Sequence, residues 1–295
     1  MLKDSLMPDE IHSITEDGSQ QYIVGDAVEE IRNLDSPASI IYLDDAWARP
    51  QRAGQFGVTY DTHPFSEDDL QGVDIDDFET TTTEVLDACK DALMEGGWLI
   101  ADTDDWLLPR LSNYLIEEWG DVAASYSGGG YRRVGAVTYL TNDGNPDRST
   151  AGMYLSNGGY SVVFAHKGET DRRTSESSRQ IVDDPFTQEG YQVTGREHDN
   201  YDWGSVKPVN PYKTWVKALT KESDIENEHL VVPCAGTAPA AIGAELTFGS
   251  SLQYTCIDNS PDAYNAFVRR REAEFELRNT SLPGEQGEID SFNDG

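Results

Sequence analysis

Residues 230–240 read LVVPCAGTAPA and combine a strand, a loop of small residues and the start of a helix. Residues 230–232 form a short apolar run of the kind that fills a buried parallel strand. The loop at 233–239 opens a helix, and a further strand at 254–257 ends in Asp258. Strand, helix and strand in this order predict one unit of an α/β fold with a parallel sheet.

The same alternation of strands and helices runs through the rest of the chain. Short apolar runs predict strands at 22–24, 39–43, 98–102, 133–140 and 160–165. Apolar residues at helical spacing predict helices at 27–34, 80–94, 106–119, 211–219 and 262–277. We expect the second of these helices to stop at Gly96 and Gly97. The whole pattern predicts a three-layer α/β sandwich with a mostly parallel, seven-stranded sheet.

Four of the predicted strands end in distinctive residues. These ends are Gly25-Asp26, Asp44 to Trp47, Pro233 to Ala238, and Asp258-Asn259. An open parallel sheet binds its ligands beyond the carboxyl ends of its strands. We therefore expect these four segments to face one functional site.

The order of the segments resembles the β class of DNA N6-adenine and N4-cytosine methyltransferases, in which the catalytic half precedes the cofactor half. The resemblance covers roughly residues 20–275. The catalytic tetrad of the family, (D/N/S)PP(Y/F/W), falls on DDAW at 44–47. Its cofactor loop, near DPFAGSGTT, aligns with residues 232–240, and its Lys-Pro pair matches Lys207-Pro208.

This resemblance implies a Rossmann-like class I methyltransferase fold with a permuted motif order. It implies S-adenosylmethionine as cofactor and double-stranded DNA as partner. The implied domain spans residues 20–278, with a target-recognition insert at 168–206 and flexible termini at 1–19 and 279–295. The residues implied to bind the cofactor are Asp26, Lys207, Pro208, Cys234, Ala235, Gly236, Thr237, Asp258 and Asn259.

The chemistry of amine methylation explains the implied catalytic residues. An exocyclic amine is a poor nucleophile, because its lone pair is delocalised into the base. The Asp44 carboxylate and the Asp45 carbonyl would accept its two hydrogens and aim the lone pair at the methyl group. Trp47 would stack on the flipped base. A tetrad that begins with Asp favours adenine N6 as the target, and cytosine N4 is the alternative.

The active motifs also depart from the family pattern. Both prolines of the tetrad are absent, since Asp45 and Ala46 occupy their positions. In the cofactor loop, Val232 replaces the leading acid and Ala238 replaces the second glycine. A degenerate, non-catalytic relative that binds cofactor, nucleic acid or a protein partner is therefore the competing hypothesis.

The composition is strongly acidic, with a formal net charge of −32 and a pI near 4.2. The acidic residues are dispersed along the chain, and only seven of the 22 basic residues are lysines. This pattern is typical of a protein adapted to molar salt, where a Debye length of about 3 Å screens repulsion from DNA. We expect a halophilic archaeal or haloviral origin; an ordinary acidic protein is the alternative.

Several other kinds of protein are disfavoured by the sequence. No stretch is long and apolar enough for a membrane span, and the N-terminus lacks the pattern of a signal peptide. We therefore expect a cytoplasmic location, which would be the host cytoplasm if the protein is viral. Its histidines lack metal-ligand spacing, so no metal is expected. We expect Asp102, Asp104 and Asp105 to lie in a solvated loop. We expect the three arginines at 269–271 to lie on the exposed side of the last helix.

Overall fold

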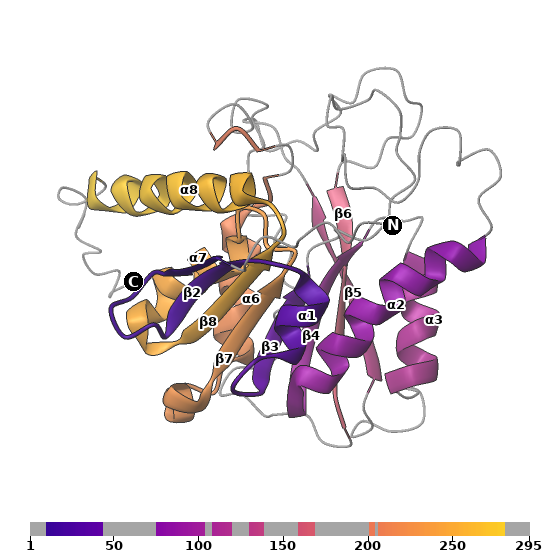
Figure 1. The fold of residues 1–295 in the computed structure, drawn as a ribbon. Coiled ribbons are helices and arrows are strands. Elements are labelled where there is room, and N and C mark those ends of the chain that lie inside the picture. The colour runs from indigo at the N-terminus through magenta and orange to yellow at the C-terminus, as the bar shows by residue number, and fades with distance from the viewer. Residues whose placement is uncertain are drawn as a thin grey trace, which may run out of the picture.

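A computed structural model of the chain describes residues 10–43, 75–103, 108–119, 130–138, 159–168, 201–203 and 206–280. These residues form an α/β structure around one sheet (Figure 1). The strands are β1 (Glu10–Ser13), β2 (Gln20–Val24), β3 (Ala38–Leu43), β4 (Leu93–Thr103), β5 (Gly130–Thr138), β6 (Gly159–His166), β7 (His229–Pro233) and β8 (Gln253–Asp258). The α-helices are α1 (Ala27–Arg32), α2 (Ile75–Ala92), α3 (Leu108–Trp119), α6 (Val209–Leu219), α7 (Pro239–Phe248) and α8 (Pro261–Thr280). Two short 3-10 helices are η3 (Glu222–Asn227) and η4 (Gly249–Ser251).

The sheet has eight strands in the order β1-β2-β8-β7-β3-β4-β6-β5. The five strands from β2 to β4 pair in parallel, and β6 and β1 pair antiparallel with β4 and β2 at either side. The predicted α/β class with a mostly parallel sheet is therefore confirmed. The eighth strand is β1, whose residues 10–13 we had assigned to a flexible terminus. Its four largely exposed residues are too short and polar to give a strand signal.

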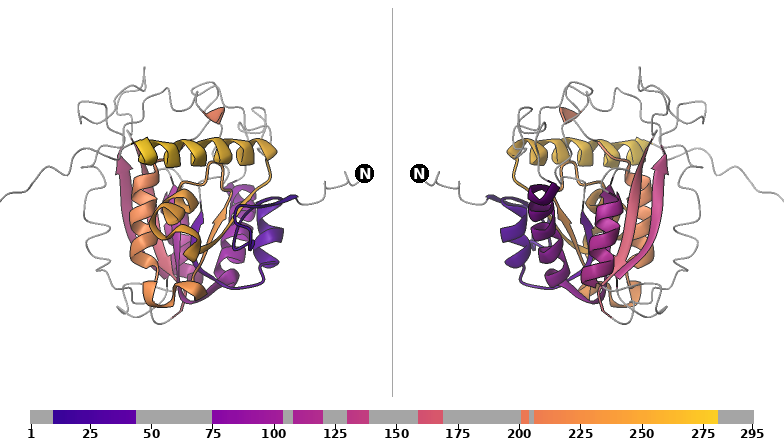
Figure 2. Two further views of the ribbon diagram at one scale, coloured as in Figure 1. Left: turned by 90° about the vertical axis from the view of Figure 1, so that its left-hand side faces the viewer. Right: turned by 90° about the vertical axis from the view of Figure 1, so that its right-hand side faces the viewer.

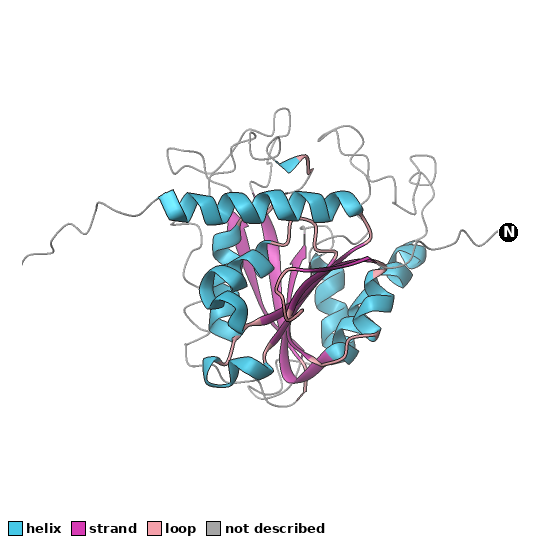
Figure 3. Ribbon diagram, turned by 60° about the vertical axis from the view of Figure 1, so that its left-hand side comes forward, coloured by secondary structure: helices cyan, strands magenta, loops and turns pink. Residues whose placement is uncertain are grey.

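Helices cover both faces of the sheet, as the three-layer prediction requires. Helices α1, α2 and α3 lie on one face, and α6 and α7 lie on the other (Figures 1 and 2). Helix α8 lies across the end of the sheet at which β7 and β8 finish (Figure 3). All residues of β3 and β7 are buried, which explains why these strands read as continuous apolar runs.

The junction between α2 and β4 differs from the prediction. The helix ends at Ala92, and the strand begins directly at Leu93. Gly96 and Gly97 belong to the strand, where the N–H of Gly96 donates to the carbonyl of Lys167 (2.8 Å). A Cβ on Gly97 would lie 2.9 Å from the carbonyl oxygen of Met94. The prediction of a glycine helix stop was wrong, because both glycines lie within the strand: Gly96 has left-handed backbone (φ +74°), and Gly97 allows close packing.

The strand order reverses between β7 and β3. The chain leaves β7 through α7 to reach β8 on one side, and leaves β3 through α2 to reach β4 on the other. Such a reversal opens a crevice at the carboxyl ends of the two strands, where open α/β sheets bind ligands. Within the described ranges, no helix combines the length and apolar character of a membrane span.

Candidate functional site

The loop at 233–239, which we call the cofactor loop, joins β7 to α7 at this strand reversal. Three of its residues have left-handed backbone: Cys234 (φ +53°), Gly236 (φ +50°) and Ala238 (φ +46°). Glycine adopts this region freely, whereas the other two store strain of about 1–3 kcal/mol each. Strained backbone just before a helix N-terminus, where N–H groups face outward, is typical of a ligand-binding turn.

The peptide groups of Gly236 are fixed from two neighbouring strands. Its N–H donates to Oδ2 of Asp258 (2.9 Å), which lies at the end of β8. Its carbonyl accepts a hydrogen bond from the Tyr22 hydroxyl of β2 (2.9 Å). Burial, reinforced by the charge of Asp258, raises the pKa of Tyr22 well above its usual value, so the phenol remains a donor. The glycine of the loop is therefore held by both a carboxylate and a phenol.

Trp203 lies against the open side of Gly236. A Cβ built on this glycine would come within 3.0 Å of Nε1 of Trp203. The indole packs on the apolar core of the α6–α7 face and is partly buried. The left-handed backbone and the indole beside it therefore both favour glycine at residue 236.

A second group of polar side chains lies buried near the carboxyl end of β4. We call it the Asp102 cluster: Asp102, Lys207, Tyr42, Tyr160 and Tyr212. Oδ2 of Asp102 accepts from the hydroxyls of Tyr42 (2.5 Å) and Tyr212 (2.6 Å) and from Nζ of Lys207 (2.9 Å). The Asp102 side chain is fully buried, and Lys207 is nearly so. Three donors on one carboxylate oxygen offset part of the free energy that burial of this charge costs.

The Tyr212 phenol of the cluster is kept in its neutral form. Burial, together with the charge of Asp102, raises the pKa of Tyr212 well above its usual value of 10. The Tyr160 hydroxyl is hydrogen-bonded to that of Tyr212, and the Tyr160 ring lies under Nζ of Lys207 (5.0 Å to the centroid). The cluster is thus a fixed set of donors around one carboxylate.

The structure brings together most of the residues expected to bind the cofactor. Cys234 to Thr237 lie on the cofactor loop, with Asp258 and Asn259 beside it at the end of β8. Asp26 follows the neighbouring strand β2, where the N–H of Gly25 donates to the carbonyl of Asp258 (2.9 Å). The Asp26 carboxylate caps α1 by accepting from two backbone N–H groups. These residues form one rim at the carboxyl ends of β2, β8 and β7.

Lys207 and Pro208 were also expected to bind the cofactor, but they lie before α6 and not on this rim. The ammonium group of Lys207 is directed to Asp102, and Pro208 precedes α6 as its buried N-cap residue. The backbone carbonyl of Lys207 is linked to the cofactor loop through Arg270. The predicted catalytic residues Asp44, Asp45 and Trp47 lie outside the described residues. They follow β3, which pairs with β7, the strand that leads into the cofactor loop.

Two residues of this region are buried, although the sequence predicted that they are exposed to solvent. Asp102 was expected in a solvated loop, because two further acids follow it, yet it is a buried residue of β4. The arginines at 269–271 were expected on the exposed side of α8, yet Arg270 is buried. The spacing of Ala263, Phe267 and Arg270 does mark the buried side of that helix, so periodicity could have found it.

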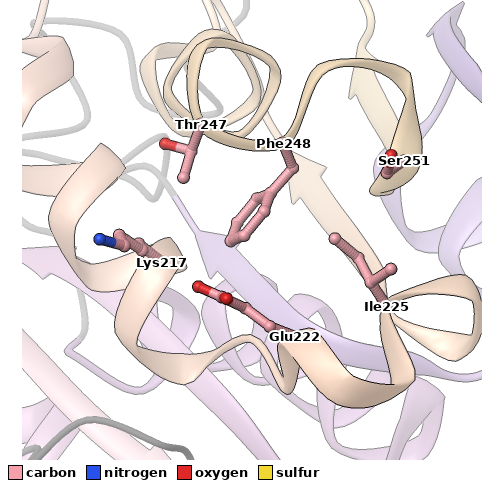
Figure 4. A pocket seen from close by; sticks show the side chains of 6 residues that line it. All are labelled: Lys217, Glu222, Ile225, Thr247, Phe248 and Ser251. Carbon is pink, nitrogen blue, oxygen red and sulfur yellow. The ribbon is translucent and has the colours of Figure 1, made fainter.

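One shallow cavity lies at the opposite end of the molecule from the cofactor loop. It has a volume of about 370 Å³ and lies where α6 and α7 end (Figure 4). Its lining is Lys217, Glu222, Ile225, Thr247, Phe248 and Ser251. Helix α7 spans about 15 Å between this cavity and the cofactor loop, so the two are separate. In the part of the chain that the structure describes, no three His, Cys, Asp or Glu side chains gather as a metal site requires.

Comparison with known proteins identifies similar structures. Neither protein-family models nor curated sequences match the chain. Among solved structures, PvuII DNA methyltransferase (cytosine-N4-specific) has a TM-score of 0.58 at 12% identity and covers 90% of this chain and 93% of its own. M1.HpyAVI in complex with SAM has a TM-score of 0.53 at 10% identity and covers 84% of this chain and 96% of its own. The chain therefore shares the α/β fold of these DNA methyltransferases.

Proposed function

We propose that this protein transfers a methyl group from S-adenosylmethionine to an exocyclic amine of a base in double-stranded DNA. The main observation behind the proposal is the cofactor loop at the strand reversal. On one side of β7, Asp258 of β8 binds the glycine of this loop. On the other side of β7 lies β3, the strand that leads to Asp44. The shared fold with DNA methyltransferases supports the same reading.

The residues around the loop fit S-adenosylmethionine. Gly236 has no Cβ, which leaves room for the Trp203 indole beside the loop. The Asp258 carboxylate accepts from the N–H groups of Gly236 and Ser260, which holds it beside the loop as the candidate acceptor for the ribose hydroxyls. The N-terminus of α7 favours the carboxylate end of the cofactor. When bound, the cofactor supplies an electrophilic methyl group on sulfur.

The catalytic roles fall to the residues after β3. The Asp44 carboxylate accepts one hydrogen of the target amine and takes up the proton that the nitrogen releases. The carbonyl of Asp45 accepts the second hydrogen, and the Trp47 ring stacks on the extruded base. We propose adenine N6 as the target, because the tetrad begins with Asp; cytosine N4 is the alternative.

A non-catalytic relative is the second candidate function. The specific observations that favour it are the Asp45-Ala46 pair in place of two prolines and the strained, non-glycine backbone at Ala238. Such a protein would bind cofactor, nucleic acid or a protein partner with the same fold. It would show cofactor binding without methylation.

Two substitutions separate the cofactor role from the catalytic role. We expect Asp258→Ala to weaken binding of S-adenosylhomocysteine by about tenfold or more, because ribose acceptors and the Gly236 brace are both lost. We expect Asp44→Ala to spare this binding and to abolish methylation. Calorimetric binding and sequencing of modified bases in DNA from expressing cells measure the two effects.

The matched control is Asp35→Ala, which removes an exposed acid at the amino end of β3 and should change neither result. Asp258→Asn serves as the milder variant if Asp258→Ala does not fold. Equal loss of binding in the Asp44 and Asp258 variants would overturn this division of roles. Unmodified DNA from cells that express a folded, cofactor-binding parent would favour the non-catalytic candidate.

A further inference from the structure

Arg270 is a buried cation in the middle of α8. Its side chain is 1% exposed, whereas its neighbour Arg269 is 44% exposed. Among the described residues, the carboxylate that pairs with it is that of Glu274, at 4.0 Å from Nε, and this Nε has no hydrogen-bond partner there. Burying an incompletely neutralised guanidinium costs free energy, so an apolar residue would serve simple packing better.

The two terminal nitrogens of Arg270 join segments that are distant in the sequence. Nη1 donates to Oγ1 of Thr237 in the cofactor loop (2.7 Å), and Nη2 donates to the carbonyl of Lys207. The ring of Tyr201 lies near the guanidinium, at 6.0 Å from Cζ to the ring centroid. One planar cation therefore fixes both the loop and the segment before α6.

Lys207 continues this path to the catalytic side of the sheet. Its ammonium group is bound by Asp102, and the same carboxylate oxygen accepts from Tyr42 of β3. Tyr42 is two residues before Asp44, so their α-carbons are separated by at most about 7 Å. Thr237, Arg270, Lys207, Asp102 and Tyr42 thus form one continuous polar chain between the two halves of the proposed site.

The neighbouring arginines do not share this role. Arg269 contacts the carbonyl of Tyr201 at the surface, and Arg271 pairs with Glu245 of α7. Both lie on parts of α8 that are at least partly exposed. Arg269 is therefore a suitable control, because it has the same charge and the same helix but no contact with the cofactor loop that the structure records.

We propose that Arg270 is a positioning residue, which fixes the cofactor loop through Thr237 and links it to the Asp102 cluster through Lys207. The proposal rests on the proposed function, because it assigns Arg270 to the binding of S-adenosylmethionine. It acts on the loop through the Thr237 side chain and does not itself react.

The test compares Arg270→Met, Thr237→Val and the double variant with Arg269→Met. Arg270→Met should weaken S-adenosylhomocysteine binding by about tenfold, and Thr237→Val by less, since it removes only one of the two contacts. The double variant should bind no worse than Arg270→Met, because both changes remove the same hydrogen bond. Arg269→Met should bind as the parent does, and Arg270→Lys, which keeps the charge and reaches one acceptor, should recover part of the affinity.

A second measurement separates positioning from stability. Hydrogen exchange of the amides at 234–238 should be faster in Arg270→Met and Thr237→Val at temperatures where both remain folded, with exchange at 253–257 unchanged. Parent-like affinity and loop exchange in Arg270→Met would overturn the proposal. If that variant does not fold, the same result in Thr237→Val overturns it. If the parent protein does not bind the cofactor, the proposed function is wrong. Hydrogen exchange of the loop amides would still test whether Arg270 fixes the loop.

Discussion

Single buried polar residues hold the candidate site in shape. Asp258 accepts from two backbone N–H groups, and Asp102 accepts from three side chains. Removing one partner of such a group leaves a buried polar atom unsatisfied, which costs about 1–3 kcal/mol. The side chains that shape this site are therefore also sensitive points for folding.

His229, at the start of β7, gives the protein a pH dependence that can be measured. Its ring is hydrogen-bonded with Ser36 and Thr255, and burial lowers its pKa from 6.5 to about 4, opposed in part by a backbone hydrogen bond at Ser36. Between these pH values the unfolded chain binds more protons than the folded one. The stability that a neutral His229 contributes is therefore complete above pH 6.5 and is lost as the pH falls toward 4, by at most about 1.4 kcal/mol per pH unit.

Urea unfolding between about pH 8 and pH 4.5 measures this slope. We expect His229→Gln to be less stable than the parent at neutral pH, and the difference between the two to shrink as the pH falls. Carboxylates titrate equally in both proteins, so they cancel in the difference. A constant difference across the range would show that His229 does not protonate on unfolding.

At the scale of elements, the contact between α6 and α7 fixes the direction of the cofactor loop. The first six residues of α7 are all buried, so the helix packs on every side. Gly243 allows the two helices to approach closely, because a Cβ there would lie 2.7 Å from the α-carbon of Lys213. The packing of α7 against α6 thus fixes the position of the loop at the N-terminus of α7.

We expect Gly243→Ala to destabilise the fold by about 1–3 kcal/mol, because the added methyl overlaps the α6 backbone. Intrinsic helix propensity alone would make the same change stabilising by about 1 kcal/mol. The sign of the measured change therefore shows whether the close contact with α6 outweighs helix propensity. Urea unfolding measures it, with Asn265→Ala on the exposed side of α8 as a control that should stay within about 0.5 kcal/mol. A stabilising effect would mean that α6 and α7 are further apart than described.

At the scale of the whole molecule, the net charge of −32 sets the conditions for folding. Like charges repel in the compact state, and salt screens this repulsion. If the composition reflects adaptation to salt, the fold should weaken below about 0.5 M KCl, where screening fades. Thermal unfolding across a KCl series measures this, with sucrose as an uncharged control that does not screen. Unchanged, cooperative unfolding in dilute buffer would instead identify an ordinary acidic protein.

The sequence by itself determined the alternation of strands and helices and the loop at 233–239. Apolar periodicity and the glycines of turns are local signals, so they were visible without knowledge of neighbouring chain segments. The seven predicted strands all occur, and most residues expected to bind the cofactor lie on one rim. The boundaries of β4 were misjudged, because Gly96 and Gly97 are typical of a helix stop, although both belong to the strand and Gly97 packs closely there.

Only the tertiary structure decided the burial of charged residues. Asp102 and Arg270 read as surface residues, because in a chain rich in charge a local pattern assigns each of them to solvent. Their partners lie far along the sequence: Arg270 is 33 residues from Thr237 and 63 from Lys207, and Lys207 is 105 from Asp102. A buried charge is stable only when such partners converge on it, and that convergence is a property of the folded sheet and not of any segment.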